Sequence, residues 1–430
     1  MSRNEITTLI EPSHDLPIVD VFVIAYTGSA HDPKGREGSL NLALRTLRRG
    51  TRRRSAREID TLLDRAGAEL STSCDATSAM LHLTVIRRNL APMLDLLAEI
   101  LGEPALPQDE LAQVSREIRA DLIDTRDDDR TLAGRFFRRT LFKAHPYGRP
   151  AAGTPDGVVS LTRDDAARAW SRTGRCANVV VAASGDISPE ELDAFAARLG
   201  AMLPKGAAPS PDVAAPKAPR GRNLVLVDKP ARSQTQIYVG GLGTHPRDRD
   251  HHALIVGNTI FGGTFTARLM REIRSKRGWS YGASSRLGRD RAREAWSMWT
   301  FPAAADAPAC VALQLQLLER LIEQGVNARE LAFARSYITK GYAFETDTAS
   351  KRLWQRLDAL LLDLPRRYYE DYVARVHAVT LDDVNAALRR RLSPKDLVLS
   401  VVCTADELRG PLEAAIPDLR ETQVIPFDTD

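Results

Sequence analysis

The two halves of this sequence repeat one order of structural elements, and that repeat constrains the fold more than any other feature. In each half a strand ending in glycine precedes a helix, a long strand and a second, apolar helix. The first strands are IVDVFVIAYTGS at residues 18–29 and QTQIYVGGLGT at residues 234–244. The helices after them begin near Ser39 and His252, and matching segments stay about 212–219 residues apart. Because order and spacing agree far better than the residues themselves, the sequence predicts two copies of one α/β unit.

The rest of each half follows the same plan. Long strands are expected at Glu69–Val85 and Ser280–Phe301, and apolar helices at Leu90–Leu101 and Ala309–Ile322. A buried strand followed by a helix closes each half. Long strands joined in antiparallel fashion, with helices grouped after them, predict an α+β fold. We therefore expect two homologous α/β sandwich domains, each a mostly antiparallel sheet with helices on one face.

A break between the two copies is visible in the composition. Residues 204–223, PKGAAPSPDVAAPKAPRGRN, are rich in proline, alanine and glycine and have no apolar period. Such a stretch resists both helix and sheet and is typical of a linker. The sequence thus predicts an N-terminal domain at residues 1–203, a linker at residues 204–223 and a C-terminal domain at residues 224–430.

Composition and charge exclude several classes of protein. The hydrophobic share of 43% and the charged share of 27% are typical of a globular protein with a sizeable core. A net charge of +4 is too small to indicate a nucleic-acid partner. No apolar run reaches the roughly 20 residues of a membrane span, and the first residues lack the features of a signal peptide. We expect a cytoplasmic location, or a periplasmic one if a leader has been removed.

The stretch GSLNLALRTLRRGT, residues 38–51, reads as a buried helix followed by a basic turn. Leucines at helical spacing give it an apolar face. Asn41 and Arg45 lie four residues apart on one face, with Leu44 between them. A helix can offer two metal ligands and a catalytic carboxylate at this spacing, but these residue types suit none of the three roles. The stretch is either an ordinary helix or a metal site that has lost its ligands.

Several spaced blocks of the sequence, together with this helix, carry a family resemblance. They are GSAHDPKGREGSLNLAL, GTRRRSAREIDTLLDRAGAELSTSCDATSAMLHLTV, FKAHPYGRPAAGTPDGVVSLTRDD and NTIFGGTFTARLMREIRSKRGWSYGASS. In order and spacing they resemble the pitrilysin/insulinase family of zinc metallopeptidases. The resemblance is to the short two-domain branch, which also includes mitochondrial processing peptidase, and it covers nearly the whole chain.

The resemblance places the family's zinc-binding motif on the helix at residues 38–51. Active members carry His-x-x-Glu-His there, in which the two histidines bind zinc and the glutamate activates water. The histidine positions fall on Asn41 and Arg45, and the glutamate position falls on Leu44. A further carboxylate ligand lies about 76 residues on in the family, which corresponds to Asp121 here. Since leucine cannot activate water and arginine carries a fixed positive charge, we expect no zinc or other cofactor in this chain.

The second half keeps a different part of the family's site. In RSKRGWSY, Arg274 and Tyr281 stand seven residues apart. The resemblance implies that the arginine donates hydrogen bonds to the substrate backbone and that the tyrosine hydroxyl holds the oxyanion. The alternative interpretation is a solvated helix arginine and a tyrosine packed at a sheet edge.

A glycine-rich loop precedes this pair. FGGTFTARL lacks the lysine and the glycine spacing of a nucleotide-binding loop. Gly262 and Gly263 instead suit a loop that approaches a bound peptide backbone. A longer glycine-rich loop at this region of the processing peptidase is implicated in substrate handling, so both glycines are candidate substrate-loop residues.

Together these features imply a zinc-free subunit of a heterodimeric metalloendopeptidase. A partner of the same family would carry the zinc, and this chain would contribute Arg274 and Tyr281 to the cleavage of a peptide. The resemblance also implies a clam-shell arrangement of the two domains. The alternative is a non-catalytic scaffold or assembly protein with the same fold, like the core subunits of the respiratory bc1 complex.

Overall fold

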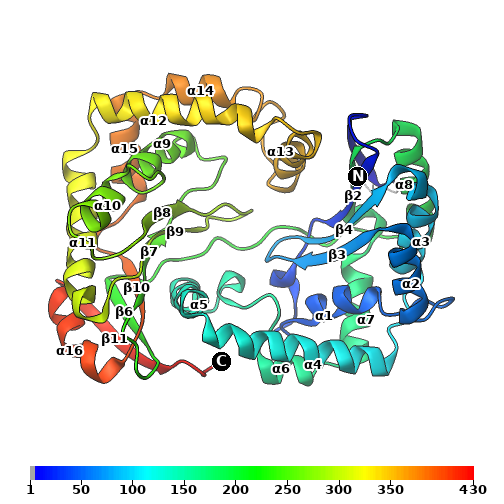
Figure 1. Ribbon diagram of the computed structural model, residues 1–430, viewed down its shortest axis with the longest axis horizontal. Helices are drawn as coiled ribbons and strands as arrows, with labels where there is room; N and C mark the ends of the chain where they lie inside the picture. Colours follow the sequence, from blue (N-terminus) through cyan, green and yellow to red (C-terminus); the bar gives the residue numbers. More distant parts are fainter. Residues whose placement is uncertain (1–4) are drawn as a thin grey trace. The chain divides into compact units, whose positions relative to one another are not determined.

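The computed structural model describes residues 5–430, which form two compact units (Figure 1). Residues 1–4, with which the predicted N-terminal domain begins, lie outside the described residues. The first unit comprises residues 5–123, Arg149–Val213 and Phe344–Asp363. The second comprises Asp124–Gly148, Ala214–Ala343 and Leu364–Asp430. Each unit therefore contains one segment from the other half of the sequence, while the predicted linker at residues 204–223 stays a prediction.

One mixed sheet forms the centre of each unit. The first sheet has the order β1-β5-β2-β4-β3, and only β1 and β5 pair in parallel. Its strands are β1 Thr7–Pro12, β2 Ile18–Ala25, β3 Glu69–Cys74, β4 Ala79–Ile86 and β5 Val179–Gly185. The second has the order β11-β6-β10-β7-β9-β8, with β6 parallel to both of its neighbours. Its strands are β6 Arg222–Asp228, β7 Gln236–Leu242, β8 Ala283–Leu287, β9 Ala295–Thr300, β10 Leu397–Cys403 and β11 Leu419–Pro426. The expected α+β class, with mostly antiparallel pairing, is confirmed.

The two long strands expected from the sequence are hairpins, so that expectation was wrong. Residues 69–86 form β3 and β4, and the amide of Asp75 donates to the carbonyl of Ser78 (2.9 Å) to close the turn between them. In the second unit the amide of Gly288 donates to the carbonyl of Ala295 (2.8 Å) at the same point. In each hairpin the two strands satisfy one another's backbone polar groups.

Helices pack against one face of each sheet, and Figure 1 shows α2, α3 and α8 along the first. The helices of the first unit are α1 Ser39–Leu47, α2 Ala56–Ala66, α3 Leu90–Gly102, α4 Gln108–Asp124, α6 Pro155–Val159, α7 Arg163–Thr173, α8 Pro189–Met202 and α13 Ala349–Leu361. Those of the second are α5 Asp129–Phe142, α9 His251–Phe261, α10 Arg268–Met270, α11 Ala307–Gln324, α12 Ala328–Gly341, α14 Tyr372–Ala378, α15 Leu381–Arg391 and α16 Ala405–Ala415. Within residues 5–430, no helix has both the length and the apolar character needed to cross a bilayer.

A single helix covers part of the opposite face of each sheet. In the first unit α13 packs on β1 and β5, and its Leu353 and Leu357 join Phe22, Ile24 and Val180 in a buried cluster. In the second unit α5 packs in the same manner on β6, β7 and β10. Both helices come from the other half of the sequence, which explains why each unit is discontinuous along the chain.

Truncation of the α13 contacts tests this packing. Leu353→Ala and Leu357→Ala should each lower the free energy of unfolding by about 2–5 kcal/mol, because each removes a fully buried side chain. Leu16→Ala is the control, since Leu16 is 64% exposed, and it should change that free energy by less than about 0.5 kcal/mol. Denaturant titration monitored by circular dichroism measures both. Equal small effects at all three positions would show that α13 does not pack on this sheet.

Candidate functional site

A buried carboxylate fixes the start of α1. Asp32 accepts hydrogen bonds from the amides of Gly38 (3.0 Å) and Leu40 (3.2 Å) and from the hydroxyl of Ser39 (2.8 Å). Gly38 has φ +91°, and a Cβ there would lie 2.5 Å from the carbonyl oxygen of Ala152, so only glycine fits. Burial raises the pKa of Asp32 to about 6. These contacts determine the register in which α1 presents its side chains.

Leu44 belongs to the core and not to a catalytic site. Its side chain is 1% exposed and packs with Leu40 and Leu47 in the apolar cluster of the first unit. Asn41 is partly exposed, and its side-chain oxygen is buried without a hydrogen-bond partner among the described residues. The position of the family's water-activating glutamate is therefore occupied by a core residue.

Arg45 is bound by carboxylates of α4. Its guanidinium lies 2.7 Å from Asp121 and 3.8 Å from Glu117. The sequence had singled out Arg45 and Asp121, and the structure brings them together. Glu117 was missed, although it stands four residues before Asp121 and therefore on the same face of α4. The positive charge of Arg45 neutralises carboxylates on the face of α4 that carries Asp121.

The residues at this site do not fit a catalytic zinc ion. Asn41, Leu44 and Arg45 supply no imidazole, thiolate or carboxylate, which are the ligands that zinc takes in proteins. Among residues 5–430, no group of three or more His, Cys, Asp or Glu side chains is arranged to hold a metal. We therefore assign no reaction step to a metal ion bound at this helix.

Arg274 lies between two exposed aromatic rings in the second unit. It sits on a π-helical turn, Arg271–Ser275, directly after α10. The guanidinium carbon is 4.3 Å from the ring centre of Tyr281 and 4.8 Å from that of Phe265. Tyr281 is 76% exposed and Phe265 is 68% exposed. Within the described part of the chain the side chain of Arg274 makes no ion pair or hydrogen bond, so its N–H donors remain available to a ligand.

Phe265 was missed by the sequence interpretation. It stands in FGGTFTARL, the loop in which only the glycines had been noted. The signal was an aromatic residue in a polar loop, which has no core to enter and so remains on the surface. Cation–π contacts with two rings hold the guanidinium in place without using its N–H groups. We call Phe265, Arg274 and Tyr281 the guanidinium stack.

The two glycines of this loop have a packing role. A Cβ on Gly262 would lie 2.4 Å from the backbone nitrogen of Ser285, and one on Gly263 would lie 2.8 Å from the Cα of Thr259. The amide of Ser285 donates to the carbonyl of Gly262 (3.0 Å) and joins the end of α9 to β8. Close approach of the backbone accounts for both glycines, while contact with a substrate stays a prediction.

Arginines next to Arg274 differ in their surroundings. Arg277 hydrogen-bonds the backbone carbonyl of Glu272 (2.8 Å) and pairs with its carboxylate (3.1 Å), so its loss would disturb the turn. Arg271 lies 3.6 Å from the same carboxylate and is half-exposed. Arg271 is therefore a better matched control for Arg274 than Arg277.

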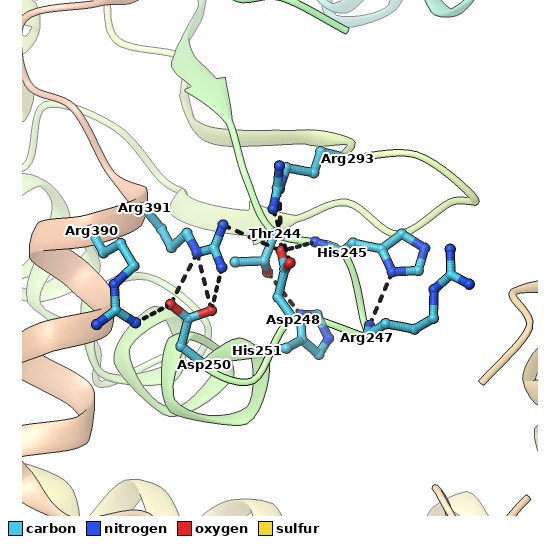
Figure 2. A network of polar contacts seen from close by, with 9 residues as sticks. All are labelled: Thr244, His245, Arg247, Asp248, Asp250, His251, Arg293, Arg390 and Arg391. Carbon is cyan, nitrogen blue, oxygen red and sulfur yellow. Dashed lines mark hydrogen bonds and ion pairs between the residues drawn. The ribbon is translucent and has the colours of Figure 1, made fainter. Parts of the chain in front are cut away.

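A network of ion pairs fixes the start of α9 in the second unit (Figure 2). Asp250 is bound by Arg390 (2.8 Å) and Arg391 (2.8 Å), and Asp248 is bound by Arg293 (2.9 Å). The adjacent His251 is buried, and its Nδ1 lies 2.8 Å from the hydroxyl of Thr244. Burial lowers the pKa of His251 to about 3 and, together with the charge of Arg375, that of His252 to about 4.

Comparison with known proteins gives a consistent picture. Residues 7–155 match the family model described as insulinase (peptidase family M16), and residues 160–338 match that of the peptidase M16 inactive domain. An uncharacterised zinc protease of Mycobacterium tuberculosis is 28% identical over 85% of this chain and 84% of its own. A non-peptidase homologue of Helicobacter pylori is 21% identical over 94% of this chain and 93% of its own. The crystal structure of a peptidase M16 inactive domain from Pseudomonas fluorescens, 25% identical, matches with a TM-score of 0.86 over 93% of this chain and 96% of its own.

Zinc content tests the loss of the metal ligands. Protein purified without a histidine tag should contain far less than one zinc ion per chain by elemental analysis, because Arg45 places a guanidinium where imidazole is needed. The double variant Asn41→His with Arg45→His is the matched positive control. It should gain zinc binding, since it supplies two imidazoles and releases Asp121 from its ion pair. One zinc per wild-type chain, lost on Arg45→Ala, would contradict the assignment.

The buried histidines predict a loss of stability in acid. Their folded pKa values lie below the ordinary histidine pKa of 6.5, so the unfolded chain takes up protons first as the pH falls. Between about pH 7.5 and 5.5 each should remove about 1 kcal/mol from the free energy of unfolding. The raised pKa of Asp32 acts in the opposite direction and offsets part of this loss. Urea titrations at several pH values should show that the free energy of unfolding depends less on pH in His252→Phe than in wild type. His377→Phe, which replaces an exposed histidine, should follow wild type. Identical curves for His252→Phe and wild type would show that His252 does not titrate as described.

Proposed function

The chain belongs to peptidase family M16, and from this membership we propose that it is the zinc-free subunit of a two-subunit metalloendopeptidase. The partner would be a second member of the family that carries His-x-x-Glu-His and a zinc ion. This chain would contribute the guanidinium stack to a shared active site that cleaves a peptide. The cytoplasmic location and the clam-shell arrangement stay predictions.

The observation that carries the proposal is that Arg274 contacts two aromatic rings and no carboxylate of the described residues. Arg45 pairs with a carboxylate, that of Asp121. Arg274 instead rests against Tyr281 and Phe265, and both rings are largely exposed. Exposed apolar surface of this kind is typical of a binding site. With this arrangement the guanidinium of Arg274 can bind a ligand that has hydrogen-bond acceptors, such as a peptide backbone.

The chemistry assigned to each side chain follows from its donors. The guanidinium of Arg274 presents N–H groups in a fixed plane and can hold a substrate carbonyl oxygen in the ground state and in the transition state. The phenol of Tyr281 can donate its O–H to the oxyanion that forms when water attacks the scissile carbonyl. The partner subunit would supply the zinc ion and the attacking water. Phe265 would act as a positioning residue that limits the directions open to Arg274.

The relatives of this chain support the proposal of a subunit without zinc. Its members include proteins named as zinc proteases and a protein named as a non-peptidase homologue, and this chain is similar to both along most of its length. A non-catalytic scaffold of the same fold is the second candidate, and the non-peptidase homologue favours it. The scaffold function would place no requirement on Arg274 and Tyr281, so these two residues distinguish the candidates.

Kinetics of the reconstituted complex test the proposed function. This chain and a family member with an intact zinc motif are assayed with a quenched fluorescent peptide, each alone and then mixed. We expect turnover only from the mixture. Tyr281→Phe should lower its turnover by roughly 10²–10³-fold, the usual effect of removing one oxyanion donor. Arg274→Ala should lower turnover and raise KM, and the two losses should be less than additive because both side chains serve one site.

The controls separate this outcome from a loss of folding or assembly. Arg271→Ala removes a neighbouring, half-exposed arginine and should leave kcat and KM near wild type. Size-exclusion chromatography should show the same complex for every variant. Full activity from this chain alone would refute the subunit assignment. A complex whose turnover is unaffected by Tyr281→Phe and Arg274→Ala would instead favour the scaffold function.

A further inference from the structure

An open pocket of about 480 Å³ lies at the N-terminal end of α9 in the second unit. Residues of α9, α14 and α15 and of the turn before α9 line it, among them Arg249, His252, Arg375 and Arg390. None of these residues belongs to the guanidinium stack or to the helix that carries Asn41 and Arg45. We call this cavity the α9 pocket.

The helix that ends at the α9 pocket has no side-chain cap. Asp250 occupies the N-cap position of α9, but its carboxylate accepts no hydrogen bond from the helix. It is held by Arg390 and Arg391 instead, as Figure 2 shows. The amide of His251 donates to the backbone carbonyl of Asp248 (3.0 Å), and the N-cap side chain accepts no hydrogen bond from the other first-turn amides of α9.

Three guanidinium groups surround the same opening. Arg249 is exposed, and its side chain makes no hydrogen bond or ion pair with any described residue. The nearest carboxylate to Arg375 is that of Asp371, at 3.7 Å. Arg390 uses one nitrogen for Asp250, at 2.8 Å, and its remaining N–H groups are available. Guanidinium groups in this number match the oxygen atoms of a carboxylate or phosphate.

The two acidic residues that line the α9 pocket are already bound. Asp250 is held by Arg390 and Arg391. Asp383 accepts hydrogen bonds from the amide (2.9 Å) and hydroxyl (2.6 Å) of Thr380, the N-cap residue of α15, and so completes a capping box. No contact within residues 5–430 joins either carboxylate to Arg249 or Arg375. Arg375 pairs only with Asp371, at 3.7 Å, and the charge of Arg249 is not cancelled by any carboxylate of the described residues.

A buried imidazole adds an independent observation. His252 lines the α9 pocket and is only 9% exposed, between the rings of Tyr368 (5.2 Å) and Tyr372 (5.5 Å). Its Nε2 atom has no hydrogen-bond partner in the described part of the chain. A buried polar atom without a partner is rare in folded proteins, and here it occurs at the wall of a cationic cavity.

We propose that the α9 pocket binds a small oxyanion, a phosphate or carboxylate group carried by a small molecule. Arg249, Arg375 and Arg390 would hold its oxygen atoms, and the uncapped end of α9 would add the favourable field of its dipole. This site is separate from the guanidinium stack. The proposal stands whether the chain is a peptidase subunit or a scaffold.

Titration calorimetry on the full-length chain tests the proposal with two probes, inorganic phosphate and citrate. Both are measured in chloride buffer at constant ionic strength, since non-specific binding to surface charge falls with salt. We expect saturable binding of at least one probe with one site per chain. Saturation by phosphate alone, by citrate alone or by both identifies which group the pocket accepts. No saturable binding of either probe would overturn the proposal.

Variants locate the site. Arg249→Ala combined with Arg375→Ala should weaken binding by roughly 10-fold or more, because it removes charged hydrogen bonds. Arg390 is left in place, since its loss would leave buried Asp250 without one of its two arginines. Arg65→Ala combined with Arg329→Ala, which removes two exposed arginines outside the pocket, is the charge-matched control and should bind as wild type. Equal effects of the control and the double variant would overturn the proposal.

A variant that keeps every charge provides a second test. Ala386→Leu adds bulk to a partly buried residue that lines the α9 pocket. It should weaken binding of the probe by a similar factor without changing the net charge. Retention of wild-type affinity by a folded Ala386→Leu protein would contradict binding in this pocket, even if the arginine variants fail to fold.

Discussion

Both sheets of this protein carry apolar side chains on both faces, and this constraint shapes the rest of the fold. All seven residues of β10 are buried, and six of the seven residues of β5 are buried. The helices that follow each sheet in sequence cover one face only, so the other face needs a further layer. That layer is a helix from the opposite half, α13 in the first unit and α5 in the second. The exchange of segments between the units is a consequence of burying β5 and β10 on both sides.

The sequence predicted the order of elements because the strands and helices have different apolar periods. It missed the β3–β4 turn because Asp75–Ser78 contains neither glycine nor proline and the alternation resumes directly after it. The turn before β9 was more visible, since Gly288 begins a polar stretch there. The positions of α5 and α13 could not be predicted, because an apolar helix face can pack on either sheet and only the contacts distant in sequence decide between them.

For the candidate site, motif spacing identified residues but could not give their contacts. Asn41, Leu44 and Arg45 were recognised because the family's motif assigns a role to each position. Glu117 has no motif role, and only the packing of α4 against α1 brings it within 3.8 Å of Arg45. Phe265 was hidden in the same way, since its contact with Arg274 depends on how the loop after α9 folds back toward the π-helical turn. Side chains that support a site are thus harder to find than the side chains named by the motif.

Arg45 and Arg274 illustrate how one residue type can serve two purposes. The N–H groups of Arg45 are bound by carboxylates of α4, so its charge is neutralised within the chain and offers little to a ligand. Arg274 is held through the faces of two aromatic rings, a contact that leaves the edge of the guanidinium free. An arginine kept in place by stacking keeps both its position and its donors, whereas an ion-paired arginine keeps only its position. The absence of zinc ligands around Arg45 in the first unit therefore places no constraint on the donors of Arg274 in the second.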